Sequence, residues 1–112
     1  MIIKKSADVT EEPMPMDGVK ASGLRWLVKE EEGARDFFMR LVTMGVGGEI
    51  PLHSHPQVHE IYVLSGNGEV TTPEGANPVA PGDFVFIPEN EKHGFRNAGQ
   101  TQFQMICCIN KV

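Results

Sequence analysis

Four histidines are the residues of this chain best suited to metal chemistry, and three of them lie within seven positions, in the run HSHPQVH from His53 to His59. Pro56 disfavours a helix here because it lacks an amide hydrogen and pushes His55 toward an extended conformation. On a strand, His53 and His55 point to the same side with Cβ atoms about 7 Å apart. Both imidazoles can then bind one ion at roughly 2.0–2.2 Å. A solvated loop that is merely rich in histidine is the alternative.

Short extended segments must position these histidines. Twelve glycines and eight prolines divide the chain, and the runs between them are rich in β-branched and aromatic residues, which predicts strands. No stretch keeps a helical period for three turns, so the pattern predicts a β-barrel or sandwich. The expected strands are Phe37 to Met44, Glu60 to Leu64, Glu69 to Thr72, Phe84 to Ile87 and Phe103 to Ile109, with weaker ones at Ile2 to Lys4 and Arg25 to Val28.

Turns and one connector complete the pattern. Glycine, proline and asparagine predict turns at residues 65–68, 73–77 and 81–83. Residues 11–18 carry no strand character and are expected to form an extended arm. The acidic run Glu30 to Glu32 predicts a solvated turn.

Size and charge limit what the chain can do. A length of 112 residues suits one domain. Ten basic and fifteen acidic residues leave a net charge of −5, which disfavours binding to nucleic acid. No apolar run approaches the ~18 residues of a membrane span, and the first residues lack the apolar region of a signal peptide. We therefore expect no membrane partner and a cytoplasmic location.

The two cysteines are adjacent, at positions 107 and 108. Neighbouring strand residues point to opposite faces, so the two thiols are badly placed to form a disulfide with each other. We expect reduced structural residues, with a reactive thiol as the alternative.

Two spaced patterns join the histidines to glycines, prolines and asparagines. They read Gly47-x5-His53-x-His55-x4-Glu60-x5-Gly66 and Gly82-x5-Pro88-x-Asn90-x2-His93-x3-Asn97. In this order they resemble the two motifs of the cupin family, here at residues 47–66 and 82–97. The family has glycine where this chain has Asn90. Asparagine is the next best residue at a left-handed turn position, so we expect such a turn there.

The resemblance implies an all-β fold. That fold is a six-stranded double-stranded β-helix, the jelly-roll barrel of cupins, with extra N-terminal strands. The expected organisation is a single domain of residues 1–112 whose N-terminal arm and strands span residues 1–36. The resemblance also implies one divalent metal ion inside the barrel and, as in many relatives, a homodimer.

The fourth metal ligand is the open choice. Most relatives would use His53, His55, Glu60 and His93. Here His59 precedes Glu60, and adjacent strand residues face opposite sides, so only one of them can reach the metal. The chain is similar to a small subgroup of single-domain cupins in which a His-Pro-x-x-His-Glu run supplies the histidine. We therefore expect the ligands His53, His55, His59 and His93, with Glu60 facing outward or supporting a ligand.

The expected function is that of a small metalloenzyme acting on an oxygenated small molecule, by dioxygenase, isomerase or lyase chemistry. Imidazole sites accept several metals, so manganese, iron, nickel and zinc all remain candidates. Glu60 is the candidate general base if it faces the cavity. The alternative is a non-catalytic module that binds or senses a small ligand or metal.

Other residues are weaker candidates. Arg40 and Arg96 could clamp a substrate carboxylate through a bidentate contact, although surface exposure is the commoner state of a strand arginine. Phe95 is expected to wall the cavity or pack in the core, and Asn97 to fix the backbone near the ligand loop. The methionines that could line an apolar pocket, or only fill the core, are Met39, Met44 and Met105.

Overall fold

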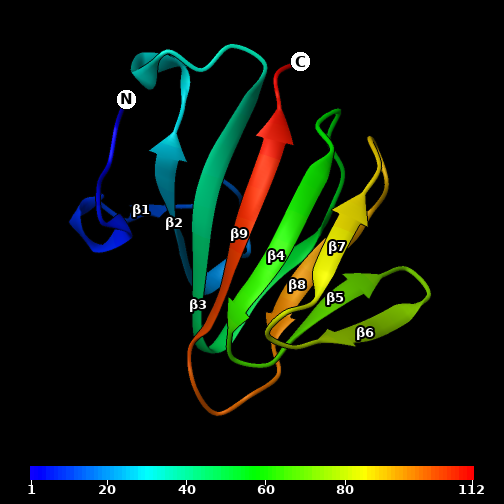
Figure 1. Ribbon diagram of the computed structural model, residues 1–112. Coiled ribbons are helices and arrows are strands. Elements are labelled where there is room, and N and C mark those ends of the chain that lie inside the picture. Colours follow the sequence, from blue (N-terminus) through cyan, green and yellow to red (C-terminus); the bar gives the residue numbers. More distant parts are fainter.

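The computed structural model describes residues 1–112, and antiparallel strands dominate it (Figure 1). This confirms the all-β class. Two short 3₁₀ turns, η1 (Ser6–Asp8) and η2 (Glu30–Glu32), are its only helical elements, and η2 is the turn predicted from the acidic run. The strands are β1 (Glu12–Pro13), β2 (Lys20–Val28), β3 (Phe37–His53), β4 (His59–Ser65), β5 (Gly68–Thr72), β6 (Gly75–Val79), β7 (Phe84–Ile87), β8 (His93–Asn97) and β9 (Phe103–Asn110). No helix has the length and hydrophobicity that a membrane span requires.

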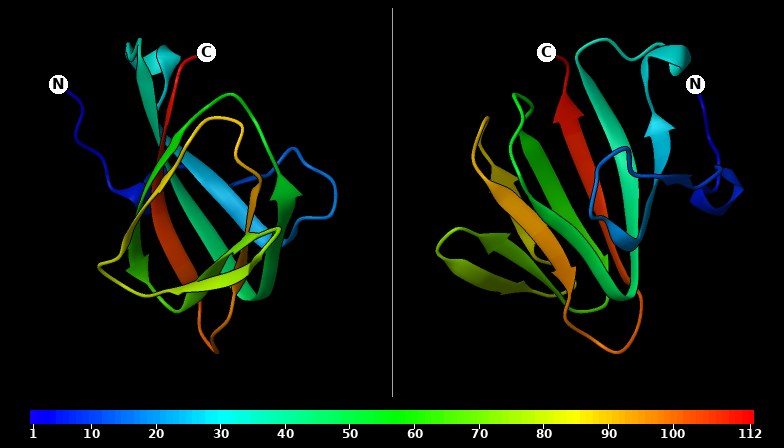
Figure 2. Two further views of the ribbon diagram at one scale, coloured as in Figure 1. Left: turned by 90° about the vertical axis from the view of Figure 1, so that its right-hand side faces the viewer. Right: turned by 180° about the vertical axis from the view of Figure 1, so that it is seen from behind.

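The long strand β3 links the two halves of the barrel. Its first part pairs with β2 and β9, and its last part pairs with β8. The strand order is β6-β5-β8-β3-β9-β4-β7, with β1 and β2 attached beside β3. Figure 2 shows the sheet curling around a common interior, which places β8 across from β4 and β9.

The barrel has one strand more than predicted. Beyond the N-terminal β1 and β2, seven strands from β3 to β9 form it. Neither β6 nor β8 was among the strands expected from the pattern; β6 pairs with β5 where residues 73–77 were expected to form only a turn. The turn is confined to residues 73 and 74, and Pro78 lies within the strand. β6 ends the strand order, and an edge strand tolerates a proline.

Other element boundaries also differ from the prediction. Residues 2–4 form no strand, since they are exposed and pair with no neighbour. The arm at residues 11–18 includes β1, two residues that pair with Gly23 and Leu24 of β2. β3 continues past Met44 to His53, because the glycine-rich stretch still pairs with β2 and then β8, with local shifts in register.

Side chains on the central strands point alternately inward and outward, and the inward ones build the core. Phe103, Met105 and Cys107 of β9 point inward, each at most 2% exposed, and Ile61 and Val63 of β4 pack beside them. Gln104 lies between two inward residues and is only half-buried. Over its first part, β9 therefore alternates between the apolar barrel interior and a more exposed face.

The motif glycines mark backbone positions that other residues adopt at a cost. Gly47, Gly66 and Gly82 have φ between +79° and +93°, and Asn90 has φ of +63°. The left-handed conformation predicted at Asn90 is thus confirmed. At Gly66 a side chain would also meet the backbone, because a Cβ atom there would lie 2.8 Å from the Cα of Phe103.

Asn97, the last residue of the second motif, fastens β3 to the connection between β8 and β9. Its buried Nδ2 lies within hydrogen-bonding distance, 2.9–3.1 Å, of the carbonyl oxygens of Met44, Gly45 and Thr101. Its Oδ1 accepts the amide of Gly99. Asn97 thus fixes the backbone, as expected, but not near the ligand loop, because these contacts lie at the far end of β8 from His93.

Candidate metal centre

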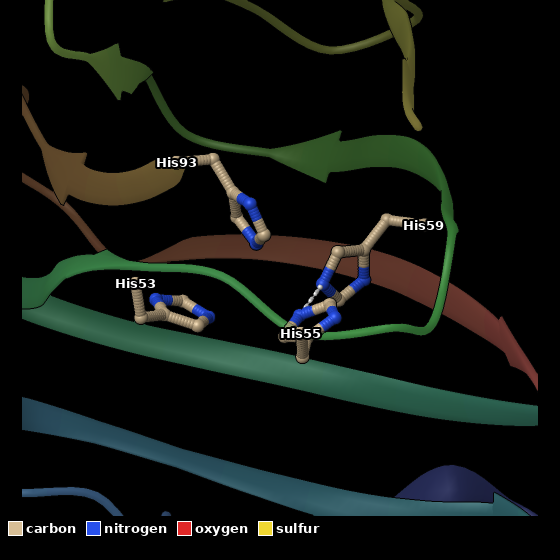
Figure 3. Close-up of side chains that lie close together, drawn as sticks. All are labelled: His53, His55, His59 and His93. Atoms are coloured by element: carbon tan, nitrogen blue, oxygen red, sulfur yellow. Dashed lines mark hydrogen bonds between the residues drawn. The ribbon is translucent and has the colours of Figure 1, made fainter. Parts of the chain in front are cut away.

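Four histidines meet inside the barrel from distant parts of the chain. His53 ends β3, His59 begins β4, His93 begins β8, and His55 lies in the connection between β3 and β4. One ring nitrogen from each lies within 4.8 Å of the others. Figure 3 shows the four rings directed toward a common point. We call these four residues the histidine cluster.

One strand pair and one loop contact help to bring the cluster together. His53 and His93 are direct partners across β3 and β8. His55 does not continue the strand as predicted, because β3 ends at His53. Instead the backbone amide of Asn90 donates to the carbonyl of His55 at 2.8 Å, so the left-handed turn of the second motif holds the loop of the first.

Three histidines of the cluster have the hydrogen-bonding state that a metal ligand needs. The Nδ1 atoms of His53, His55 and His93 lie 2.7–3.0 Å from the backbone carbonyls of residues 51, 57 and 91, respectively. A carbonyl can only accept, so each Nδ1 carries the hydrogen and donates it. Each Nε2 then keeps a free lone pair, which is the form in which neutral imidazole binds a metal.

Two contacts of the Nε2 atoms are those that a bound cation would satisfy. The Nε2 of His93 is buried without a hydrogen-bond partner. The Nε2 atoms of His55 and His59 lie 2.8 Å apart; when His59 carries its hydrogen on Nδ1, both present lone pairs, which repel each other unless a cation lies between them. Two nitrogens that bind one ion at roughly 2.0–2.1 Å are separated by about this much. The donor set therefore fits a transition metal such as zinc, manganese, iron or nickel.

Burial favours the neutral form of three of these imidazoles. Desolvation, helped by the neighbouring Arg40, lowers the pKa of His59 to about 2. Desolvation also lowers the pKa of His93 to about 4, and it lowers the pKa of His55. Neutral imidazole is the form that binds a metal, so these three residues are ready for a cation at neutral pH without losing protons.

Glu60 does not reach the cluster. His59 is 5% exposed and points inward, whereas Glu60, next along β4, lies on the exposed outer face. Opposite Glu60 on the neighbouring strands stand Cys108 and Phe86. The condition for Glu60 to act as a general base, that it face the cavity, is not met.

A cavity of about 180 Å³ opens beside the cluster, and its walls are largely apolar. Arg40 is its one permanently charged side chain, and no carboxylate or lysine lines it. Arg40 forms no ion pair with a carboxylate and packs against the ring of Trp26, 5.5 Å from its centre. The lining residues are Met14, Pro15, Met16, Leu24, Arg40, Val42, Ile50, His53, His55, His59, Phe95, Met105 and Cys107.

The structure separates the weaker candidates. Arg40 faces the cavity as a clamp would, whereas Arg96 lies on the outer surface and pairs with Glu69, which is the commoner state of a strand arginine. Phe95 and Met105 line the cavity. Met44 is fully buried in the core away from it, and Met39 is 37% exposed, so neither lines the pocket.

Two parts of the cavity wall were missed from the sequence. The arm closes one side with Met14, Pro15 and Met16, and no local pattern indicated that it would reach the barrel interior. Cys107 was expected to be a structural residue, or alternatively a reactive thiol, and not part of the cavity wall. The sequence contained a signal for the wall, because Cys107 shares the inward face of β9 with Met105. Burial raises the pKa of the Cys107 thiol, an effect that the nearby Arg40 opposes.

Comparison with known proteins supports the resemblance found in the motifs. The family model described as Cupin domain matches residues 40–109. The solved structure of the polyketide cyclase RemF from Streptomyces resistomycificus superposes with a TM-score of 0.93 and 29% identity, over 98% of this chain and 79% of that one. This superposition confirms the jelly-roll class. The limits of a single domain at residues 1–112 stay a prediction.

Two curated relatives have different activities in their names. Polyketide synthase CurC of Streptomyces cyaneus is 35% identical over 75 residues, 66% of this chain and 49% of the relative. The 1-methylthio-D-xylulose 5-phosphate methylsulfurylase of Rhodospirillum rubrum is 31% identical over 72 residues, 64% of this chain and 46% of that protein. The chain therefore spans about half the length of these relatives.

The opposite facings of His59 and Glu60 generate a first prediction. His59→Ala should weaken zinc affinity by more than about 100-fold, since it removes a nitrogen of the cluster, whereas loss of an outer supporting group costs about 10–100-fold. Glu60→Ala should leave the affinity within about threefold of the wild-type value, because the exposed Glu60 touches no cluster nitrogen. Competition with a chromophoric chelator measures both values. The reverse ranking would show that the carboxylate binds the ion.

The lowered pKa of His93 generates a second prediction, for the metal-free protein. Between pH 5.5 and 4.5 the unfolded chain carries a proton on His93 whereas the folded protein does not, so acid favours unfolding. Each such histidine adds about 1.4 kcal/mol per pH unit to the slope of the unfolding free energy. His93→Gln should lower that slope by nearly this amount. Urea unfolding at several pH values measures it, and an unchanged slope would contradict the lowered pKa.

Proposed function

The chain belongs to the cupin family, and we propose that it is a metalloenzyme whose histidine cluster binds one divalent ion beside a small-molecule cavity. The convergence of four imidazoles beside a cavity whose one permanently charged side chain is Arg40 carries this proposal. Manganese, iron, nickel and zinc suit such nitrogen ligands. Without a carboxylate ligand, the bound ion keeps its full double charge and supplies a strong Lewis acid for a carbonyl oxygen.

The charges around the cavity favour an anionic substrate rich in oxygen. The Nη2 of Arg40 lies 3.4 Å from the Nδ1 of His59, so the guanidinium stands next to the cluster. No carboxylate lining the cavity balances this positive charge. An anionic oxygen can provide the balance, and a guanidinium binds such oxygens through charge-assisted hydrogen bonds. The apolar walls, including Phe95 and Met105, suit a flat carbon skeleton.

The names of two relatives suggest the substrate class. One is a polyketide cyclase and another a polyketide synthase. We therefore propose that the substrate is a short enolisable chain of alternating carbonyl groups, and that the reaction closes a ring. A volume of about 180 Å³ is below the ~300–1,000 Å³ of drug-sized ligand pockets, so it suits one ring of such a chain.

The proposed reaction needs no general base from the protein. A carbon between two carbonyls loses its proton to water readily once those carbonyls are polarised. The resulting enolate carbon forms a bond to a carbonyl carbon of the same chain, and that carbonyl oxygen takes up a proton. The carbon–carbon bond closes the ring, and loss of the new hydroxyl group with a neighbouring hydrogen, as one water, then forms a double bond within it. Arg40 would hold the negative enolate oxygen, and the apolar walls would exclude other water from the ring.

Arg40 gives this function its test. The probe is a linear tetracarbonyl compound, incubated with manganese- or zinc-loaded protein, and the product is a ring lighter by one water, measured by chromatography with mass spectrometry. Arg40→Gln should slow ring closure by about 100-fold, as the loss of one oxyanion donor does. Arg96→Gln is the matched control and should react at the wild-type rate, because Arg96 lies outside the barrel.

The same assay separates the alternatives. Ring closure at equal rates with wild-type protein and Arg40→Gln would contradict the role of Arg40. Oxygen consumption instead of water loss would indicate a dioxygenase. Binding of the probe without product would favour the non-catalytic module, which the lack of a base in the cavity also supports.

We also propose that two copies associate as a homodimer through the outer face of β4 and β7. Tyr62, Phe84 and Phe86 are each more than half exposed there, and Tyr62 stands directly opposite Phe84 across the two strands. β7 ends the strand order, so its outer edge has no partner within the chain. Such an apolar face at a sheet edge is costly to leave in water.

Sedimentation tests the homodimer. The wild-type protein should sediment as a dimer, and Phe84→Arg should shift it to a monomer with little change in melting temperature, since Phe84 is 81% exposed. Val46→Arg changes another exposed apolar residue, on β3, and should leave the dimer intact. A monomeric wild-type protein would contradict the proposal.

A further inference from the structure

One histidine of the cluster differs from the other three in what its Nδ1 contacts. His53, His55 and His93 donate to backbone carbonyls within two residues of themselves. The Nδ1 of His59 lies instead 2.7 Å from the Sγ of Cys107, a residue far away in sequence on β9. The orientation of His59 therefore depends on a side chain, whereas that of the other three depends on the local backbone.

The strand registers place three side chains together at this point. Arg40 of β3 stands directly opposite Cys107 of β9, and Cys107 stands opposite Ile61 of β4, two residues from His59. The Nη2 of Arg40 donates to the Sγ of Cys107 at 3.0 Å. Cys107 is 1% exposed, so water does not compete for its sulfur. The sulfur is thus within reach of two nitrogen donors.

The choice of hydrogen position on His59 decides whether it can bind a metal. If Nδ1 carries the hydrogen, it donates to Cys107 and Nε2 is free to bind. Arg40 cannot accept this hydrogen, because a guanidinium only donates. Without the sulfur, the Nη2 of Arg40 at 3.4 Å could itself donate to Nδ1. The ring hydrogen would then move to Nε2 and block the metal ligand.

We propose that Cys107 is a positioning residue for His59, whose sulfur accepts the Nδ1 hydrogen and keeps Nε2 free for the metal. This inference rests on the proposed metal site but not on the proposed reaction. It gives the buried Cys107 a role that Cys108, on the opposite face of β9, does not share. It also gives Arg40 a second function, because its donation to the sulfur directs the guanidinium away from Nδ1.

Four proteins test the positioning role through zinc affinity, measured by chelator competition without any substrate. Cys107→Val keeps an apolar side chain but no acceptor, and it should bind zinc about 10–100-fold more weakly than wild type, as loss of a supporting partner does. Cys107→Ser restores an acceptor and should recover most of the affinity. Cys108→Val should match the wild type. If Cys107→Val does not fold, Cys107→Ala takes its place.

Nitrogen-15 spectra of the histidine side chains supply the readout that a purely structural role would not change. In metal-free wild-type protein, His59 should carry its hydrogen on Nδ1. In metal-free Cys107→Val the hydrogen should move to Nε2, with a melting temperature near the wild-type value. Equal zinc affinity in wild type and Cys107→Val, or an unchanged hydrogen position, would overturn the inference. Failure of the wild-type protein to bind zinc would instead overturn the metal site itself.

Discussion

The constraint on which this structure depends is the convergence of four imidazole nitrogens inside a largely apolar barrel. Folding brings the cluster together without a carboxylate to balance a cation. The Nε2 of His93 is left without a partner, and the Nε2 atoms of His55 and His59 face each other. A buried polar atom without a partner costs about 1–3 kcal/mol. A bound cation would remove this cost, so metal binding would stabilise the fold as well as enable chemistry.

The rest of the fold holds these nitrogens in place. Paired strands β3 and β8 set His53 against His93, and β4 carries His59 toward them from the opposite side of the interior. The loop with His55 has no ladder of its own, and the amide of Asn90 holds it from the second motif. The two motifs therefore act as one unit, in which the left-handed turn of the second fixes the ligand loop of the first.

Features set by local stereochemistry could be predicted from the sequence. The left-handed turn at Asn90 and the inward facing of β9 follow from residue type and from alternation along a strand. The opposite facings of His59 and Glu60 follow from the same alternation. Features set by distant partners could not be predicted. β6 forms because β5 lies beside it, and the sulfur of Cys107 meets His59 only through the pairing of β4 with β9.

The charge of the site connects its structure with its chemistry. A divalent ion with four neutral ligands and the guanidinium of Arg40 would bring three positive charges to one small cavity, and no carboxylate lines it. Burial makes such an excess costly, because charges interact strongly where water is scarce. An anionic oxygen ligand would relieve this cost, and a neutral ligand of the same shape would not. Because Glu60 points outward, the positive charge of a bound ion would remain available to the ligand, and a preference for enolate- or carboxylate-like oxygens would follow from that facing.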